Sequence, residues 1–419
     1  MPLQCSRTLI QTTTAAFVAA IAPASLAGDC PDEFTPACPR WEVIETKVPP
    51  GFCGGFPPQF QVRDIDDRGV VVGSLRCGSS RHAAIWIPGE EIRRIEMPDG
   101  TIESDAVGID AKGRIAGDLI NSDSETFGWI LDGDEFTLIP VADGFAEIRV
   151  EGMALDGSIA GNMIGGPPSF VFRWSDGAFD FLPAPIVGTN TTVLGMTDDG
   201  ALYGRMSNWK PGVTAPVIVE GNEWKILPMP PDAIFGEVRD AETADLATGR
   251  VAFPEGVGAT TIWNGDQLDV VFGDLDGPVG MSPSAIDYDG VVHAGDFTPD
   301  ESDPKWMLVD GSIVATLQDL IAGLPADAEP VTWYTRGPLA IGQSLRANPN
   351  GRVIWRAMRV PGVPGDIDCD GRTGFEDLLA VVSAWSCEQS ARADLDLDGV
   401  VGASDLMIVI NGWNRPSGG

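Results

Sequence analysis

The sequence predicts a mainly β protein, with a seven-bladed β-propeller of about 44 residues per blade followed by a small α-helical domain that holds two EF-hand-like calcium loops. Three observations lead to this prediction. Glycine-ended apolar runs recur at near-constant spacing, hairpin-type turns follow each run, and two aspartate-rich loops lie near the C-terminus. The 51 glycines and 33 prolines among 419 residues suit short strands joined by tight turns, and 43% hydrophobic residues can supply a core. We expect a signal peptide at 1–27, the propeller at 28–361, a linker at 362–365 and the C-terminal domain at 366–416.

The first 27 residues have the pattern of a secretory signal peptide. Arg7 precedes the short apolar stretch 14–22, and residues 24–27 supply the small side chains of a cleavage site. A membrane anchor would need a longer apolar run, and a lipoprotein would need a cysteine where Asp29 stands. We therefore expect a protein that is secreted, extracellular or displayed on the cell surface, and not inserted in a membrane.

Six cysteines remain after removal of the signal peptide with its Cys5, and an even number favours disulfide bonds in an exported protein. They are Cys30, Cys38, Cys53, Cys77, Cys369 and Cys387. The sequence leaves their connectivity open, and we expect the local pairs 30–38, 53–77 and 369–387. No Cys-x-x-Cys pair occurs and histidine is scarce, so a zinc site is not expected.

The middle of the chain is a repeat. An Asp/Gly turn and an apolar run end at glycines that are 43 to 47 residues apart, namely Gly73, Gly117, Gly161, Gly204, Gly249, Gly295 and Gly342. In each repeat a second apolar run leads into another turn glycine, namely Gly89, Gly133, Gly177, Gly221, Gly265, Gly311 and Gly362. Asp-Gly and Asn-Gly turns favour hairpins, and a further short strand follows each second turn up to the sixth.

Four short strands per repeat, repeated seven times, match the arithmetic of a β-propeller. An extended β-solenoid or a set of β-sandwiches is the alternative, but solenoid coils are usually shorter and sandwiches rarely keep a constant spacing. The seventh repeat ends at 359–362 without a last strand, whereas a spare strand at 41–48 precedes the first repeat. Pairing of these two would close a ring and cover a sheet edge.

The pattern of turn, apolar run and His-Ala-aromatic-x-Trp resembles the HAF-type extracellular repeat proteins. The resemblance covers residues 60–360, and its nearest match is His82-Ala83-Ala84-Ile85-Trp86. It implies an extracellular propeller without a defined activity.

Two loops near the C-terminus have the acidic spacing that a calcium ion requires. Alternate carboxylates in a tight loop converge on one point, and Ca²⁺ needs six to eight oxygen ligands. The first loop supplies Asp366, Asp368, Asp370, the Arg372 carbonyl and Asp377, and the second loop, 28 residues later, supplies Asp394, Asp396, Asp398, the Val400 carbonyl and Asp405. We expect two calcium ions, each followed by a helix, at 375–385 and 403–413.

This tandem of loop and helix resembles a type I dockerin over residues 366–414. The family implies calcium-dependent folding and binding to a cohesin-like module or another cell-envelope partner. Its partner-reading positions fall on Phe375, Glu376, Ala403 and Ser404, and they differ between the two copies. Position 9 of each loop is glycine (Gly374 and Gly402), which removes a ligand. The cysteines at 369 and 387 resemble those of the Cys-bearing dockerins of planctomycete-like bacteria.

The net charge of −34, from 61 acidic and 27 basic residues, argues against a nucleic-acid partner. A glycosidase needs two carboxylates at a defined separation. Because 61 acidic residues would always include such a pair, their presence does not predict a glycosidase. His82 and His293 lie in different repeats and fit ordinary strand or turn positions, and no hydrolase or phosphate-binding motif occurs. We expect no catalytic residue in the propeller.

The sequence favours a non-catalytic binding or display propeller tethered by a dockerin, with a glycan as a further candidate partner. A dockerin-bearing glycoside hydrolase or lyase, with its site in the propeller funnel, is the alternative.

Overall fold

The structure is a computed structural model of the 419-residue chain. It describes residues 41–47, 59–78, 80–166, 170–254, 258–272, 282–286, 292–295, 306–310, 312–316, 321–324, 328–336, 339–346, 352–359, 365–367, 372–385, 393, 395 and 401–413. The chain divides into two compact units, one formed by Trp41–Arg359 and the other by residues 360–419 together with residues 1–40. Each unit is described by itself. The expected signal peptide lies outside the described residues, and so do five of the six expected disulfide cysteines. Cys77 ends β3, but its side chain is not described, so the expected disulfide pairs stay predictions.

The larger unit is built of antiparallel sheets whose strands follow one another in chain order. Four sheets have four strands each: β2 (Gln59–Ile65), β3 (Val71–Cys77), β4 (Ser80–Trp86) and β5 (Arg93–Arg94); β6 (Thr101–Ile109), β7 (Ile115–Asn121), β8 (Thr126–Asp132) and β9 (Glu135–Ile139); β10 (Glu147–Met153), β11 (Ile159–Ile164), β12 (Phe170–Ser175) and β13 (Ala178–Leu182); and β22 (Ser282–Ile286), β23 (Val292–Gly295), β24 (Trp306–Asp310) and β25 (Ser312–Thr316).

Two further sheets vary this pattern. The eight-stranded sheet consists of two antiparallel groups joined by a single parallel bridge between Thr214 and Phe235. Its strands are β14 (Asn190–Met196), β15 (Leu202–Lys210), β16 (Val213–Glu220), β17 (Glu223–Ile226), β18 (Phe235–Ala241), β19 (Leu246–Ala252), β20 (Gly258–Asn264) and β21 (Gln267–Phe272). The five-stranded sheet has the order β26 (Ile321–Ala322), β1 (Trp41–Lys47), β29 (Arg352–Arg359), β28 (Leu339–Arg346) and β27 (Ala328–Arg336).

The N-terminal strand β1 pairs with the last strand of the seventh repeat, as the sequence predicted. Trp41 lies opposite Arg359 and Lys47 opposite Ile354, in antiparallel register. The two ends of the larger unit are therefore joined in one sheet by main-chain hydrogen bonds, and the outer edge of β29 is covered.

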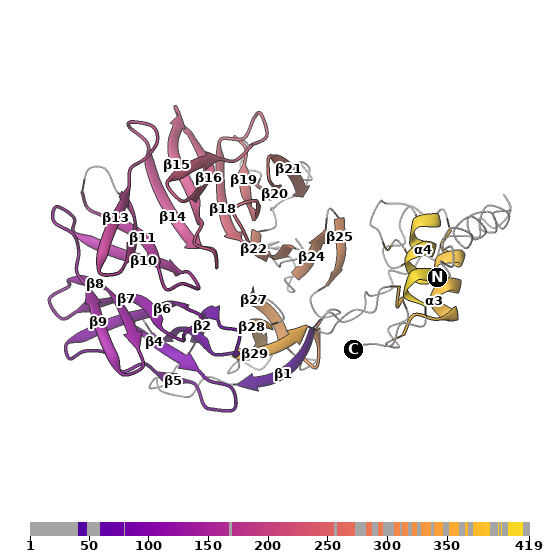
Figure 1. The fold of residues 1–419 in the computed structure, drawn as a ribbon, viewed down its shortest axis with the longest axis horizontal. Coiled ribbons are helices and arrows are strands. Elements are labelled where there is room, and N and C mark those ends of the chain that lie inside the picture. Colours follow the sequence, from indigo (N-terminus) through magenta and orange to yellow (C-terminus); the bar gives the residue numbers. More distant parts are fainter. Residues whose placement is uncertain are drawn as a thin grey trace, which may run out of the picture. The chain divides into compact units, whose positions relative to one another are not determined.

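The first strand of each repeat lies toward the centre of the unit, and the last strand lies at its periphery (Figure 1). Each first strand carries a β-bulge near its C-terminal end or middle, with one extra residue relative to its partner, and β6 has a second bulge at Ile102. The extra residues are Arg63, Val107, Glu151, Leu194, Arg239, Ser284 and Val331. A bulge redirects a side chain and increases the local twist, so these positions decide what faces the centre.

The recurring glycine of the sequence repeat has a packing reason. A Cβ added at Gly117 would overlap the carbonyl oxygen of Asp105 on the neighbouring first strand, and it would lie 2.6 Å from the indole of Trp129 on the third strand. Gly73, Gly161, Gly204 and Gly249 meet a first-strand carbonyl in the same way. The second strand therefore needs glycine where the bulged first strand approaches it.

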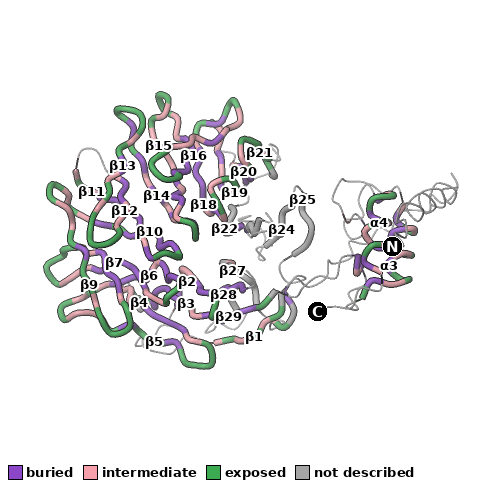
Figure 2. Tube along the Cα trace, in the orientation of Figure 1, coloured by how far each residue is buried: buried purple, intermediate pink, exposed green. Residues whose placement is uncertain are grey.

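The core lies between neighbouring sheets. Large side chains of the third strands, Trp86, Trp129, Trp263 and Trp355, are all almost fully buried. One core cluster joins β2, β3 and β4 to Ile341 and Ile354 of the last repeat, so burial continues across the join of the two ends. Figure 2 shows that the buried residues of the larger unit lie on its inner strands and the exposed residues on its outer turns.

The smaller unit contains helices α3 (Phe375–Ser383) and α4 (Ala403–Gly412), at the positions that the sequence predicted. Their core consists of Ile367, Val381, Ala384, Ala393, Val401 and Val409. A Cβ added at Gly365, whose φ is +86°, would lie 2.8 Å from the Cα of Val409, so the chain before the first loop packs directly on α4. Among the described residues, no helix is long and apolar enough to cross a membrane.

Candidate functional site

A cavity of about 640 Å³ opens between the first strands of the larger unit. It is lined by the bulge residues Arg63, Val107, Glu151, Leu194 and Arg239, and also by side chains of β4, β7, β15, β22 and β27. This volume lies within the range of about 300–1,000 Å³ that is typical of small-molecule sites. The cavity therefore brings together residues that are far apart in the sequence, from most of the repeats.

The centre of the charged lining is Asp105 on β6, which is 2% exposed. Its Oδ2 accepts a hydrogen bond from Nη2 of Arg63 at 3.1 Å and one from Nη1 of Arg81 at 3.3 Å. Its other oxygen, Oδ1, is buried and has no hydrogen-bond partner in the described part of the chain. Asp105 is thus held by two cations on one side and still has an unused acceptor on the other.

Asp118 lies directly opposite Asp105 in the β6–β7 pair and lines the same cavity. The pKa of Asp118 is raised to about 7, mainly by burial. The negative charges of Asp105 and Glu151 also raise this pKa, whereas the positive charges of Arg81 and Arg63 lower it. Burial also raises the pKa of Glu151, whose carboxylate accepts a hydrogen bond from Nδ2 of Asn162 at 3.1 Å. With a pKa of about 7, Asp118 holds a proton below neutral pH.

Asp240 on β18 lines the other side of the cavity. Burial raises its pKa to about 6, although its carboxylate accepts hydrogen bonds from the backbone N–H groups of Ile286 and Ala241. Asp64, at the equivalent place in the first repeat, accepts a hydrogen bond from the N–H of Ile109 at 2.9 Å. These two aspartates connect a first strand to the first strand of the next repeat, so they hold the cavity wall together.

Two other repeats have glycine instead of aspartate at this position, and there the next first strand packs closely against the glycine. A Cβ added at Gly108 would lie 2.6 Å from Cβ of Met153, and one added at Gly152 would lie 2.7 Å from Cβ of Met196. In these four repeats the residue after the bulge is therefore either an aspartate that bonds to the next first strand (Asp64 and Asp240) or a glycine that lets that strand approach (Gly108 and Gly152).

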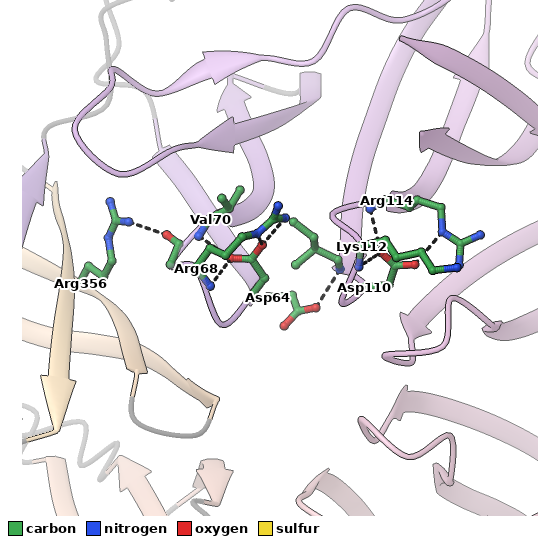
Figure 3. Close-up of polar contacts among 10 residues, drawn as sticks. Asp64, Arg68, Val70, Asp110, Lys112, Arg114 and Arg356 are labelled. Carbon is green, nitrogen blue, oxygen red and sulfur yellow. Dashed lines mark hydrogen bonds and ion pairs between the residues drawn. The ribbon is translucent and has the colours of Figure 1, made fainter. Parts of the chain in front are cut away.

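The Asp-Gly turns of the first two repeats form a second set of contacts around the unit. Oδ1 of Asp110 accepts hydrogen bonds from the N–H groups of Lys112 and Arg114, and its Oδ2 accepts one from Nε of Arg114 at 2.6 Å (Figure 3). Arg114 also donates to the carbonyl of Asp156 in the next repeat at 3.0 Å. The aspartates that the sequence marked as turn residues thus orient arginines that bridge neighbouring repeats.

Arg356 makes the corresponding bridge from the last repeat to the first. Its Nη1 donates to the carbonyl of Gly69 at 2.5 Å, in the turn that Figure 3 places beside Arg68 and Val70. Its Nη2 donates to Oε2 of Glu45 at 2.6 Å, and its guanidinium carbon lies 4.3 Å from the ring centre of Trp86. The buried side chain of Arg356 on β29 thus contacts both β1 and the first repeat.

The calcium-loop residues are described only in part. Asp366, Arg372, Asp377 and Asp405 have described positions, whereas Asp368, Asp370, Asp394, Asp396, Asp398 and Val400 lie outside the described residues. Oδ1 of Asp377 accepts a hydrogen bond from the N–H of Ile367, and its Oδ2 accepts one from the N–H of Gly374. Asp405 makes the same two bonds, with Leu395 and Gly402. Both carboxylates are buried and tie the start of a loop to the first turn of its helix.

The partner-reading residues predicted from the dockerin resemblance are exposed. Phe375 and Glu376 begin α3, Ala403 and Ser404 begin α4, and Phe375 is 60% exposed. His82 lies in β4, where burial and the charge of Arg94 lower its pKa and the charge of Glu103 raises it. His293 lies in β23, and its side chain is not described.

Sequence reasoning missed the cavity residues. It placed no site residue in the propeller, because the acidic side chains were too numerous to distinguish. A signal was available, since Arg63, Glu151 and Arg239 all stand two residues before the last residue of a first strand. A charged residue at this position interrupts the expected alternation, as a bulge does.

No known protein family matches the sequence, and no curated protein is similar to it. Among solved structures, the chain is similar to the β-propeller domain of the Trilobed protease from Pyrococcus furiosus, with a TM-score of 0.50 and 11% identity over 72% of this chain and 95% of that one. TolB from Acinetobacter baumannii matches with a TM-score of 0.36 and 13% identity over 72% of this chain and 80% of that one. The larger unit therefore has a β-propeller fold, which by itself does not define an activity.

Proposed function

We propose that the protein is a secreted, non-catalytic binding module, in which a closed propeller of seven blades binds a polar ligand in its central cavity. The observation that carries this proposal is the convergence of charged side chains from several repeats on one cavity of about 640 Å³. Pairing of β1 with β29 supports a closed ring, because it joins the first and last repeats in one sheet. A pocket of this size with a few fixed polar groups is the usual form of a ligand site.

A variant that fills the cavity tests this role. Leu194 lines the cavity at a bulge, so Leu194→Trp adds volume where the ligand would lie. Leu155 is 41% exposed and does not line the cavity, so Leu155→Trp is the matched control. In a thermal-shift screen against polar metabolites and oligosaccharides, we expect at least one compound to raise the melting temperature of the wild type and of Leu155→Trp, but not of Leu194→Trp. The proposal fails if no compound behaves in this way.

We also propose that residues 366–416 form a calcium-dependent dockerin that tethers the propeller to a cohesin-like module or another cell-envelope protein. The support is the repeated arrangement of Asp377 and Asp405, which both bond to the N–H of the second loop residue and to the N–H that precedes their helix. Calcium would be held by these two side chains and the other aspartates of each loop, and it would neutralise their charge. The chemistry of this donor set fits calcium, because it consists of oxygen ligands only.

A pull-down with the full chain from the source cell envelope tests the tether. We expect specific proteins to be retained with Ca²⁺ and released by chelator. A chain that lacks residues 366–416 should retain none of them, although its propeller still folds. Equal retention with and without Ca²⁺ would contradict the proposal.

A second candidate is a dockerin-bearing glycoside hydrolase, and the pair formed by Asp105 and Asp118 favours it. One carboxylate held by two arginines beside another that keeps its proton to about pH 7 is the type of pair that acid catalysis uses. If this candidate is correct, the protein releases reducing ends from a polysaccharide, and Asp118→Asn abolishes the release. The exposed turn residue Asp134 provides the control, because Asp134→Asn removes the same charge outside the cavity.

A further inference from the structure

The charges that line the central cavity are not balanced. Its acidic residues outnumber its arginines by eight to four: Asp64, Asp105, Asp118, Glu147, Glu151, Asp198, Asp240 and Glu242 against Arg63, Arg81, Arg149 and Arg239. Each arginine already has a carboxylate partner. Arg63 and Arg81 pair with Asp105, Arg149 pairs with Glu147 at 2.5 Å, and Arg239 pairs with Glu237 at 2.6 Å. The acidic charge of the lining therefore exceeds the positive charge that its four arginines supply.

Three acceptors in this part of the cavity make no hydrogen bond or ion pair of their own with a cation that the structure describes, although Arg63 and Arg81 act electrostatically on Asp118, and Arg63 and Arg149 on Glu151. The carboxyl group of Asp118 has no hydrogen bond or ion pair with any residue that the structure describes. Glu151 receives only the amide of Asn162 within the described chain. Oδ1 of Asp105, in a residue that is 2% exposed, has no hydrogen-bond partner among the residues that the structure describes. These three groups lie on β7, β10 and β6, and all of them line the same cavity.

Without a bound ligand, the buried carboxylates of this cluster destabilise the folded protein. A desolvated carboxylate without a partner is destabilised, and its pKa rises until a proton replaces the missing cation. Asp118 shows this effect, because burial and then the charge of Asp105 raise its pKa to about 7. A ligand with a positive charge would supply the missing partner and would lower the pKa again.

We propose that the cavity binds a small ligand through a cationic nitrogen, an ammonium or guanidinium group, which lies between Asp118, Glu151 and Oδ1 of Asp105. This inference rests on the proposed binding role of the cavity and names its ligand class. The charged groups around Asp118 are Arg63 on β2, Arg81 on β4, Asp105 on β6 and Glu151 on β10. The ligand cation takes the place of the proton on Asp118, so binding below about pH 7 releases a proton into the solution.

Calorimetric titration of the full chain with matched pairs of probes tests this inference. Putrescine is compared with 1,4-butanediol, and glucosamine with glucose, so that a free amine and an amino sugar are distinguished as sources of the cation. We expect each amine to bind at least about tenfold more tightly than its neutral partner, since a buried charge contact contributes more than the roughly 1.4 kcal/mol of a tenfold change. Putrescine should bind about tenfold more tightly at pH 7.5 than at pH 5.5, because Asp118 loses its proton between these values.

Two variants identify the site of binding. Asp118→Asn and Glu151→Gln keep the shape of the side chains and remove one charge each, and we expect each to weaken amine binding about tenfold or more. Asp134→Asn should bind as the wild type does, because Asp134 is exposed in a turn outside the cavity. Asp118 makes no ion pair among the described residues, so Asp118→Asn should keep the fold, and far-UV circular dichroism of both variants checks that it does.

Each other outcome overturns the inference. Neutral probes that bind as tightly as the amines would show that charge is not recognised, while the binding role of the cavity would stand. Amine binding that persists in both variants would place the amine elsewhere. Absence of amine binding also overturns it, whereas the binding role itself fails only if the library screen yields no ligand that Leu194→Trp abolishes.

Discussion

Nη2 of Arg356 donates to Oε2 of Glu45 at 2.6 Å, although 311 residues separate them in the sequence. Arg356 is 1% exposed and lies on β29, while Glu45 lies on β1. The same guanidinium also reaches the turn carbonyl of Gly69 and the face of Trp86. This buried cation therefore connects the N-terminal strand, the last repeat and the first repeat, at the place where the ring closes.

The first prediction concerns this connection. Arg356→Met keeps most of the side-chain volume but removes the donor to the Gly69 carbonyl and the buried cation from Glu45, which keeps only the N–H of Gly89 at 3.3 Å and Lys47 at 3.9 Å. Loss of one partner of a buried pair costs about 3 kcal/mol or more. We expect the free energy of unfolding of the propeller to fall by that amount in urea titrations. Arg149→Met is the control, because Arg149 is exposed and its ion pair with Glu147 is worth less than about 1 kcal/mol. Equal effects of the two substitutions would contradict the role of Arg356.

Removal of strand β1 tests closure of the ring directly. A chain shortened to begin at Val48 loses the main-chain pairing with β29, whereas a chain that begins at Arg40 keeps it. We expect the first to melt at a lower temperature and to aggregate faster, because it exposes the edge of β29. Unchanged thermal stability after removal of β1 would show that this pairing does not stabilise the unit.

Close approach of neighbouring first strands gives a third prediction. A Cβ at position 152 would lie 2.7 Å from Cβ of Met196, so Gly152→Ala forces two strands apart. Such overpacking costs about 1–3 kcal/mol. Gly258→Ala is the control, because its Cβ would meet only the carbonyl of Val251 at 3.7 Å. Thermal unfolding followed by circular dichroism should show a lower melting temperature for the first variant and little change for the second.

The pKa of Asp118 predicts how stability depends on pH. The pKa of this carboxyl group is near the ordinary value of 3.8 in the unfolded chain and about 7 in the folded one. Between these values the folded state binds more protons, so this group lowers stability as the pH rises from about 4 to 7. Asp118→Asn removes this effect and should raise the free energy of unfolding at pH 8 by roughly 2 kcal/mol or more, with little change at pH 4. Unfolding titrations at the two pH values measure the difference, and an equal effect at both would contradict the assignment.

The last prediction concerns the C-terminal unit. Asp377 accepts the N–H groups of Ile367 and Gly374, so Asp377→Ala leaves two backbone donors without a partner in a buried place. We expect a loss of about 2 kcal/mol and a weaker response to Ca²⁺, measured as proteolytic protection of residues 366–416 in the full chain. Glu376→Ala is the control, since Glu376 is exposed in the same helical turn. Full protection of the Asp377 variant would show that this side chain does not organise the loop.

Most of the fold could be predicted because its causes are local. The glycines at 73, 117 and 161 mark places where the second strand meets a bulged first strand, and the turn aspartates Asp66 and Asp110 bond to backbone groups only two and four residues ahead. Such contacts leave a repeated pattern in the sequence. The helices of the smaller unit were also predictable, because their apolar spacing and the acidic residues in their first turns are local signals.

The sequence by itself determined the repeat length, the turns, the pairing of the N-terminal strand with the last repeat and the two C-terminal helices. Only the tertiary structure decided that Asp105, Asp118 and Glu151 share one cavity, and that Arg356 links both ends of the ring. The reason is physical. Strand periodicity fixes which side of its own sheet a residue faces, but the pKa of a carboxyl group and the partner of an arginine depend on charges and burial supplied by other repeats.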